Sequence, residues 1–434
     1  MKRRIVIVVE VFNREILSVI LLKRELEKRG YNVSIKRKSE DLSYIDCDIL
    51  VVPNGYKTSS YYDYRYRFFC KSGKIINLQW EQLHTRYEER NNLWLADGKA
   101  KDLVFLCWGN NRVEQLKGIG VGDNKIFKVG PIHTDVMREE FNPIWLKRED
   151  IASRYNMDNG KEWLLFISSM TYAPDDSPYI NSEKTHSDYM DYNKRHVLEK
   201  NTQKKLLLWF EKIISDRKDV IVIYRPHPTE IGSELLDMAS KKNKDNFRVI
   251  HDYDLKQWIK VSDILAVWNS TSVIECSLTG KKTIILRPFE MEYNEEYVLY
   301  DGAKMQKTYV EFENELNNMD SSFPIMTKRL EYYYDIKEIP SYIRIANTIE
   351  SIYADDGYSL VEKFFGVKRI WYLVRKGIYL KLILKSVYMF IHERTGFRIR
   401  SKRIRNKYFV DCWEKTNYER RRVKQIEEAI KKIV

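Results

Sequence analysis

Two polar residues that follow an apolar stretch are the first candidates for chemistry. In the segment VIVIYRPHPTE (220–230), Arg225 and His227 come directly after a run typical of a buried strand. The prolines on either side of His227 restrict the backbone there. Arg225 presents a planar fork of donors suited to phosphate or carboxylate, and His227 can donate to a phosphate oxygen or protonate a leaving phosphate. The alternative is a proline-bounded turn with a solvated histidine.

A second candidate is the segment ILAVWNSTSVIECSLTG (264–280), in which a strand leads into hydroxyl-bearing residues. Ser270, Thr271 and Ser272 are expected to open a helix. Hydroxyls and free N–H groups at such a position form an anion site, here suited to a monophosphate or diphosphate. Glu275 lies about one turn further on, where its carboxylate can accept hydrogen bonds from both hydroxyls of a ribose. The alternative is an ordinary helix cap with a solvated glutamate.

Two acidic residues follow strands of the first half of the chain. Glu81 comes after the apolar segment 75–78, and Glu10 comes after the segment 4–9. A carboxylate that faces a cleft between domains can act as general base for an acceptor hydroxyl. The alternatives are a surface position for Glu81 and, for Glu10, a structural pair with Arg14 at i,i+4 spacing.

Other chemistry has less support. His133, Asp135, His251 and Asp252 also follow predicted strands and are weaker candidates. The motifs HExxH, GxxxxGK[ST], GxGxxG and GxSxG do not occur, so zinc proteases, P-loop enzymes, dinucleotide dehydrogenases and serine hydrolases lose their main sequence support. The five cysteines are scattered without a CxxC spacing, which argues against a disulfide framework or a zinc knuckle.

The apolar runs predict the elements that must hold these residues. In the first half, a helix is expected over 14–29, capped by Asn13 and ended by Gly30. Alternation of such helices with strands predicts an open parallel sheet covered on both faces. The predicted strands are 4–9, 33–36, 48–53, 75–78, 103–108 and 126–130.

A second α/β series begins near residue 163. Ligands bind beyond the carboxyl ends of the strands in such sheets, which is where the candidates above fall. The polar insertion 171–200 is long for a connecting loop and is either a binding loop or a mobile segment. The predicted strands are 163–168, 220–224, 247–250, 264–268 and 283–286; the predicted helices are 204–215, 230–241, 255–261 and 271–279. The expected domains are 1–150, 160–345 and a helical segment 346–434, with a boundary near 138–159.

Composition and charge bound the class of protein. The chain has 434 residues, which is too long for one ordinary core. Of these residues 44% are hydrophobic, which is too many for a disordered chain. No run approaches the length of a membrane-spanning helix, and the apolar run after the N-terminal basic residues is too short for an export signal. A cytoplasmic location is therefore expected.

The positive charge is concentrated near the C-terminus. The net charge is +13, while residues 361–434 alone hold 21 Lys and Arg against 7 Asp and Glu, a net +14. Basic, aromatic and aliphatic residues at helical spacing suit a helix that lies on an anionic bilayer. Packing against the body of the protein is one alternative. Nucleic-acid binding is the other, but no recognition motif supports it.

The order of the motifs resembles that of bacterial surface-carbohydrate biosynthesis proteins of the GT-B type, over roughly residues 5–290. The motifs that carry the resemblance are Glu10, Arg14, Glu15, Leu21 and Leu22; Glu81; Val129-Gly130-Pro131; Arg225–Pro228; Asp254–Asp263; and Asn269–Glu275 followed by Gly280. Gln79-Trp80-Glu81 stands where that pattern has an acidic pair. The resemblance implies two Rossmann-like domains that face each other across a cleft, plus the basic helical extension.

The resemblance also implies a function. The His-Pro motif with a later Ser/Thr-rich turn is similar to that of transferases that use CMP-sugars, including sialyltransferase-like and Kdo-transferase-like enzymes, and to that of CDP-glycerol polymerases of wall teichoic acid. In such enzymes the histidine and the Ser/Thr turn bind the nucleotide phosphate, which implies these roles for His227, Ser270, Thr271 and Ser272.

We therefore expect a glycosyltransferase of capsule or lipopolysaccharide synthesis. A nucleotide-sugar donor, preferably a CMP-sugar, would be its co-substrate, with no other cofactor. A metal is not required, since His227, Arg225 and N–H groups can stabilise the leaving phosphate. The acceptor would be a glycan or a lipid-linked molecule, and residues 361–434 would hold the enzyme on the inner face of the cell membrane. The alternatives are a glycerophosphotransferase that uses CDP-glycerol and a non-catalytic carbohydrate-assembly protein.

Overall fold

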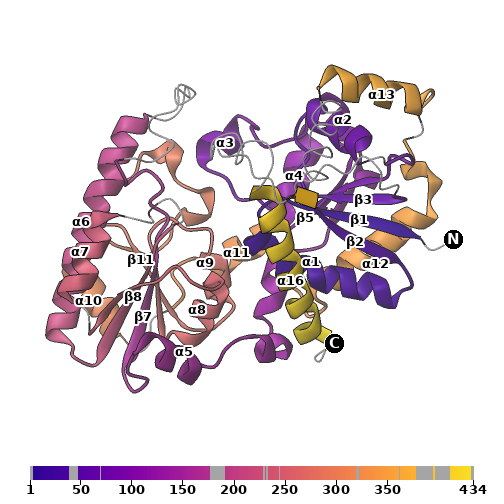
Figure 1. Ribbon diagram of the computed structural model, residues 1–434. Coiled ribbons are helices and arrows are strands. Elements are labelled where there is room, and N and C mark those ends of the chain that lie inside the picture. The colour runs from indigo at the N-terminus through magenta and orange to yellow at the C-terminus, as the bar shows by residue number, and fades with distance from the viewer. Residues whose placement is uncertain are drawn as a thin grey trace. The chain divides into compact units, whose positions relative to one another are not determined.

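The computed structural model resolves the chain into two compact α/β units (Figure 1). It describes residues 3–38, 47–68, 70–175, 191–227, 230, 233–243, 245–318, 322–360, 362–377, 394–395 and 411–431. The first unit comprises Met1–Gln82, Trp94–Val136 and Tyr332–Val434, and the second comprises Leu83–Leu93 and Met137–Glu331.

The first unit contains a sheet whose described strands all run parallel, in the order β2-β1-β3-β4-β5-β6. Continuous apolar runs form the inner strands because a parallel sheet is covered on both faces. The strands are β1 (Arg4–Val9), β2 (Asn32–Arg37), β3 (Ile49–Val52), β4 (Ile75–Asn77), β5 (Val104–Cys107) and β6 (Ile126–Lys128). Its helices are α1 (Phe12–Lys28), α2 (Thr58–Arg67), α4 (Asn110–Gly118), α12 (Ser341–Ala354), α13 (Phe365–Arg375) and α16 (Asp411–Lys431).

The second unit repeats this plan with the order β12-β11-β10-β7-β8-β9, again parallel over the described strands. The strands are β7 (Glu162–Ile167), β8 (Val220–Arg225), β9 (Phe247–Val249), β10 (Ile264–Val267), β11 (Lys282–Leu286) and β12 (Met305–Gln306). The helices are α3 (Arg86–Arg90), α5 (Arg148–Tyr155), α6 (Tyr192–Asp216), α7 (Glu234–Lys242), α8 (Leu255–Val261), α9 (Val273–Ser277) and α10 (Tyr309–Asn317). Helix α11 (Thr327–Tyr333) spans the boundary between the two units.

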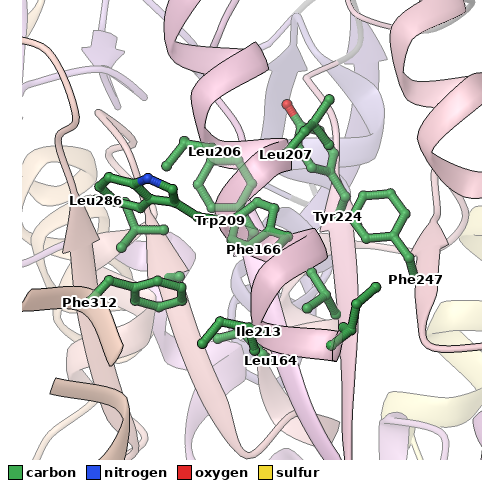
Figure 2. Packing of buried hydrophobic residues seen from close by; sticks show 14 of the residues in the cluster. Leu164, Phe166, Leu206, Leu207, Trp209, Ile213, Tyr224, Phe247, Leu286 and Phe312 are labelled. Carbon is green, nitrogen blue, oxygen red and sulfur yellow. The ribbon is translucent and has the colours of Figure 1, made fainter. Parts of the chain in front are cut away.

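The core of the second unit lies between its sheet and helix α6. Phe166 of β7, Tyr224 of β8 and Phe210 of α6 are fully buried, and the Phe166 ring packs against the other two, with centroid distances of 5.1 Å to Tyr224 and 5.2 Å to Phe210. Figure 2 shows this cluster, in which Trp209 and Phe312 lie beside Leu286. Burial of this size fixes the strands and therefore fixes the loops that leave their carboxyl ends.

Helix α1 begins differently from the prediction. Asn13 was expected to cap it, but the N-cap is Val11, which makes no side-chain cap bond, and Asn13 lies inside the helix. The carboxylate of Glu15, fully buried, instead accepts hydrogen bonds from the backbone N–H groups of Glu10 and Val11 at 2.8 and 3.0 Å. Glu15 thus ties the N-cap residue and the residue before it to the first turn of the helix. Gly30 ends the helix with φ of 87°, as predicted.

The units divide the chain differently from the expected domains. Helices α12 and α16 pack on α1, so these parts of the expected extension 346–434 belong to the first unit. Residues 83–93 belong to the second unit although they lie between β4 and β5 in the sequence. Backbone contacts join these residues to the segment 296–297 of the second unit. The Arg86 N–H donates to the Glu296 carbonyl at 3.1 Å, and Thr85 forms a β-bridge with Tyr297.

Candidate functional site

The sheet of the second unit brings the two predicted phosphate-binding segments to one edge. Arg225, Ile167 and Val267 lie in one row across β8, β7 and β10. His227 lies two residues beyond this row on one side, and Asn269 lies two residues beyond it on the other. Strands β8 and β10 are separated only by β7, so their ends are roughly 10 Å apart. Both segments leave from carboxyl ends of the strands, where open α/β sheets bind ligands.

His227 sits in a turn that its own backbone closes. Its N–H donates to the Glu230 carboxylate at 2.9 Å, and the Glu230 N–H donates back to the His227 carbonyl at 2.8 Å. Burial lowers the pKa of the His227 imidazole, which favours the neutral form of the ring. A neutral ring acts as a hydrogen-bond donor to phosphate more readily than as a general acid. Pro228, the second of the two prolines expected to brace this histidine, lies outside the described residues.

The guanidinium of Arg225 donates hydrogen bonds to backbone carbonyls of the protein. Its Nη1 donates to the carbonyls of Ile250 and Asp252, at 3.1 and 2.6 Å, and its Nη2 donates to that of Tyr253 at 2.6 Å. The side chain therefore fastens the turn that joins β9 to α8 beside the end of β8. A phosphate contact, as predicted, would have to compete with these bonds.

The Ser/Thr segment is held through its own backbone groups, which bond to the side chain of Tyr300. The Ser270 N–H donates to the hydroxyl of Tyr300 at 3.1 Å, and that hydroxyl donates to the Ser270 carbonyl at 2.8 Å. Helix α9 spans only Val273–Ser277, shorter than the predicted 271–279. The half-exposed side chains of Thr271 and Ser272 are therefore the accessible groups of this segment.

Glu275 is buried and already has a cation near it. Its Oε1 lies 3.7 Å from the Nζ of Lys256, which also lies 3.8 Å from Asp254. Burial raises the pKa of Glu275, and the charge of Lys256 opposes this shift. A contact with ribose hydroxyls remains a prediction for this carboxylate.

Arg287 was missed by the sequence analysis. It follows β11, is 2% exposed, and lies next to the Ser/Thr segment, with Nη2 3.4 Å from the Asn269 Oδ1 and 3.1 Å from Glu296. Its buried Nε has no hydrogen-bond partner among the described residues. The sequence signal was present, since TIILR places an arginine after an apolar strand just as VIVIYR does.

A buried ionic network surrounds Trp268 at the same edge. The guanidinium groups of Arg195 and Arg287 lie 5.1 and 5.7 Å from the Trp268 ring, a distance that allows cation–π attraction. Arg195 also pairs with Glu199 at 2.6 Å and with Glu295 at 2.9 Å. Nothing in the sequence pattern indicated this network, because its members come from segments a hundred residues apart.

The two candidate bases lie at the carboxyl edge of the first sheet. Glu81 forms an ion pair with Arg14, and Arg14 also contacts Glu15 at 3.2 Å. Glu10 pairs with Lys38 at 2.6 Å. The Arg14–Glu10 pair offered as an alternative is therefore wrong, because Arg14 bonds to the other two carboxylates. Both candidates are half-exposed, so each can reach a ligand.

Three of the four weaker candidates have structural partners. Asp135 is buried and accepts the Ser341 and Tyr342 N–H groups at 3.0 and 2.7 Å, which caps helix α12. The His133 ring lies 4.6 Å from that of Trp108. Asp252 accepts the Tyr155 hydroxyl at 2.7 Å, while His251 is exposed.

The polar insertion 171–200 is described only in part. Residues 176–190 lie outside the described residues, and 192–200 form the first turns of α6. In the described part of the chain, no three His, Cys, Asp or Glu side chains are grouped as metal ligands, and no helix is long and apolar enough to span a bilayer.

Comparison with known proteins supports the fold. No protein-family model matches the chain, and no curated protein matches it. A Listeria monocytogenes protein assigned as a UDP-N-acetylglucosamine 2-epimerase has a similar structure, with a TM-score of 0.54, 13% identity, and coverage of 82% of this chain and 97% of that one. The wall teichoic acid polymerase TagF, in a variant soaked with CDPG, gives a TM-score of 0.53, 11% identity, and coverage of 80% and 88%. UDP-GlcNAc 2-epimerase from Methanocaldococcus jannaschii gives a TM-score of 0.51 and 14% identity, with coverage of 80% of this chain and 99% of that one.

These likenesses define the class of fold. The chain is an α/β protein with two Rossmann-like units of the GT-B kind, which confirms the predicted fold class.

Proposed function

We propose that this protein is a glycosyltransferase of bacterial surface polysaccharide synthesis. It moves a sugar from a nucleotide-activated donor, preferably a CMP-sugar, to a glycan or lipid-linked acceptor. The observation that carries the proposal is the convergence of the His227 turn and the Ser270–Ser272 segment on one edge of the second sheet. Structures with this fold that were determined with a nucleotide, MnaA with UDP and TagF soaked with CDPG, add support.

The proposed reaction divides between the units. His227, the Ser270–Ser272 segment and Arg287 bind the donor phosphate, and Glu275 takes the ribose. Glu81, or less directly Glu10, removes the proton of the acceptor hydroxyl. The acceptor oxygen then bonds to the anomeric carbon of the sugar while the bond from that carbon to the phosphate oxygen breaks. Hydrogen bonds from His227 and backbone N–H groups stabilise the nucleotide that leaves, without a metal or other cofactor.

A second candidate is a glycerophosphotransferase that uses CDP-glycerol. The structural likeness to TagF, a wall teichoic acid polymerase, favours it. In that case the acceptor oxygen would attack phosphorus and form a phosphodiester, with CMP leaving. The same His227 turn would contact the phosphate in both reactions, so the geometry of the site does not separate them.

A donor panel tests the proposal. CMP, CDP, UDP and GDP, and sugars or glycerol linked to them, are compared by thermal shift and by hydrolysis of the donor. We expect CMP to stabilise the protein and CMP-sugars to be hydrolysed slowly without acceptor. Hydrolysis of CDP-glycerol alone would instead identify the glycerophosphotransferase. Absence of any nucleotide effect would overturn both and favour a non-catalytic carbohydrate-assembly protein.

The proposal includes an anionic membrane surface as partner, on the inner face of the cell membrane. Helix α13 supports it, because one side of the helix is anchored and the other is apolar and exposed. The Tyr66 ring of α2 lies 5.6 Å from Phe365 and 5.4 Å from Tyr372, and the Arg369 Nε donates to the Tyr66 carbonyl at 2.7 Å. The opposite side exposes Phe364, Val367, Ile370, Trp371 and Val374 to 57–73%.

Charge on the same helix matches an anionic bilayer. Lys368 and Arg375 flank the apolar side, while Lys363 and Lys376 lie at the two ends of the helix; all four are exposed, and Lys368 also pairs with Glu362 at 2.8 Å. Apolar residues that enter the headgroup region, with lysine and arginine beside them, are typical of interfacial helices. Residues 378–393 of the expected membrane segment lie outside the described residues.

Vesicle flotation tests this partner. The double variant Ile370→Ser/Trp371→Ser should reduce binding to vesicles of phosphatidylglycerol and phosphatidylcholine at least about tenfold, since two large apolar side chains are lost. Val310→Ser is the matched control, because Val310 is also 60% exposed but lies on α10 of the second unit. Equal flotation of all three proteins, or no binding by the wild type, would contradict the assignment.

A further inference from the structure

The turn after β8 contains a carboxylate that the proposed reaction does not use. Glu230 is 0% exposed, and the sequence pattern predicted it as the first residue of a helix over 230–241. Helix α7 begins at Glu234 instead. A fully buried carboxylate is costly unless several donors satisfy it.

Five neutral donors converge on Glu230. Its Oε1 accepts from the Ser168 hydroxyl at 2.6 Å, the Met170 N–H at 3.3 Å and the His227 N–H at 2.9 Å. Its Oε2 accepts from the Tyr224 hydroxyl at 2.9 Å and the Gln203 amide at 3.1 Å. The carboxylate thus joins the loop after β7, the end of β8, helix α6 and the His227 turn.

The arrangement makes the position of His227 depend on Glu230. The two residues bond to each other in both directions, since the Glu230 N–H also donates to the His227 carbonyl at 2.8 Å. Ser168 and Met170 belong to the loop after β7, the strand that lies between the two proposed phosphate-binding segments. An acceptor-only group in this place holds all five donors in one orientation, which a neutral group cannot do.

We propose that Glu230 is a positioning residue of the donor site, which fixes the His227 turn against the loop after β7 without touching the donor itself. This inference rests on the proposed function, because it assigns the donor phosphate to His227. Its effect on binding follows from geometry: a turn that is already fixed pays less entropy when the donor binds.

The charges around Glu230 make its function depend on pH. Burial raises the pKa of Glu230 to about 7, against the hydrogen bonds of Ser168, His227 and Tyr224. The buried carboxylate of Glu199 on α6 adds to the increase, and Arg195 neutralises part of that charge. The Tyr224 hydroxyl and the His227 ring are titratable groups in the same cluster. The loop after β7 contributes the Ser168 hydroxyl and the Met170 N–H, and its described part also carries Tyr172, whose N–H donates to Glu199 at 2.7 Å, and Asp175, which pairs with Lys200. Protonation of Glu230 below neutral pH should therefore loosen the His227 turn.

The test uses Glu230→Gln in the full chain. Glutamine keeps the shape but presents an amide where two donors now meet an oxygen, so nucleotide binding should weaken about tenfold at pH 8 and lose its dependence on pH between 6 and 8. Binding of CMP and CDP is measured by calorimetry.

A ligand-free measurement separates this inference from the proposed function. The ring signal of His227 is followed by NMR on histidine-labelled protein, assigned with His227→Gln, and His251 serves as internal control. The wild-type His227 signal should show an inflection near pH 7 that Glu230→Gln removes, while the His251 signal is the same in both. If His227 behaves identically in both proteins, the inference is overturned. If the His227 signal changes but no nucleotide binds the wild type, the role of Glu230 in fixing the His227 turn is supported. The assignment of the donor phosphate to His227 is then overturned.

Discussion

The carboxyl edges of the two sheets are built in different ways. At the edge of the first sheet, the side chains of Glu10 and Glu81 are 37% and 45% exposed and pair with Lys38 and Arg14. At the edge of the second sheet, Glu230 is 0% and Arg287 is 2% exposed. Apart from the buried Glu15, the candidate bases and their partners at the first edge are solvated, whereas Glu230 and Arg287 at the second edge are desolvated.

This difference in burial fits the different functions proposed for the two edges, acceptor activation at the first and donor binding at the second. Exposed ion pairs contribute little to stability and rearrange at low cost, which suits carboxylates that must meet an incoming acceptor and exchange protons. Buried charges with several partners are rigid and expensive to break. Such groups suit a site that holds the phosphate of a donor through bond cleavage, where donors already in place need not reorganise.

The largest expected effect is on turnover. His227→Ala should lower the rate of sugar transfer about a thousandfold or more, since it removes a donor to the leaving phosphate. The free energy of unfolding should change by less than about 1 kcal/mol, because the Glu230 bonds to the turn use backbone groups. Transfer is assayed with the donor that the panel identifies. His251→Ala, which removes an exposed histidine after β9, is the control and should keep full activity; full activity in His227→Ala would remove the central residue of the proposal.

Removing one charge at each edge compares them directly. Arg287→Ala should cost about 3 kcal/mol of unfolding free energy, because it leaves the Glu296 carboxylate with one buried partner fewer. Lys38→Ala, at the exposed pair with Glu10, should cost less than about 1 kcal/mol. Urea unfolding of both variants gives the values. Similar losses would show that the edges do not differ energetically.

Much of this contrast could not be predicted from the sequence. Apolar runs located most of the strands, since burial on both faces leaves a continuous signal, as in RIVIVV of β1. The two-residue strand β12 has no such run and was missed. Glu230 shows why the site was harder to predict: the sequence pattern placed it only at the start of a helix, and the tertiary fold shows that five donors enclose it.

The pH dependence of stability provides a smaller and more specific test of the buried edge. The pKa of Glu230 is raised from 4.5 to about 7, so the folded state binds its proton more tightly than the unfolded state does. The resulting stabilisation is complete below pH 4.5 and is lost as the pH rises through 7, by at most about 3 kcal/mol. Glu15, Glu199 and Glu275 are also shifted upward, so the wild-type curve alone is ambiguous. The difference between wild type and Glu230→Gln, measured by urea unfolding from pH 5 to 8, isolates one carboxyl. That difference should favour the wild type less at pH 8 than at pH 5, and a constant difference would mean that Glu230 keeps one protonation state throughout.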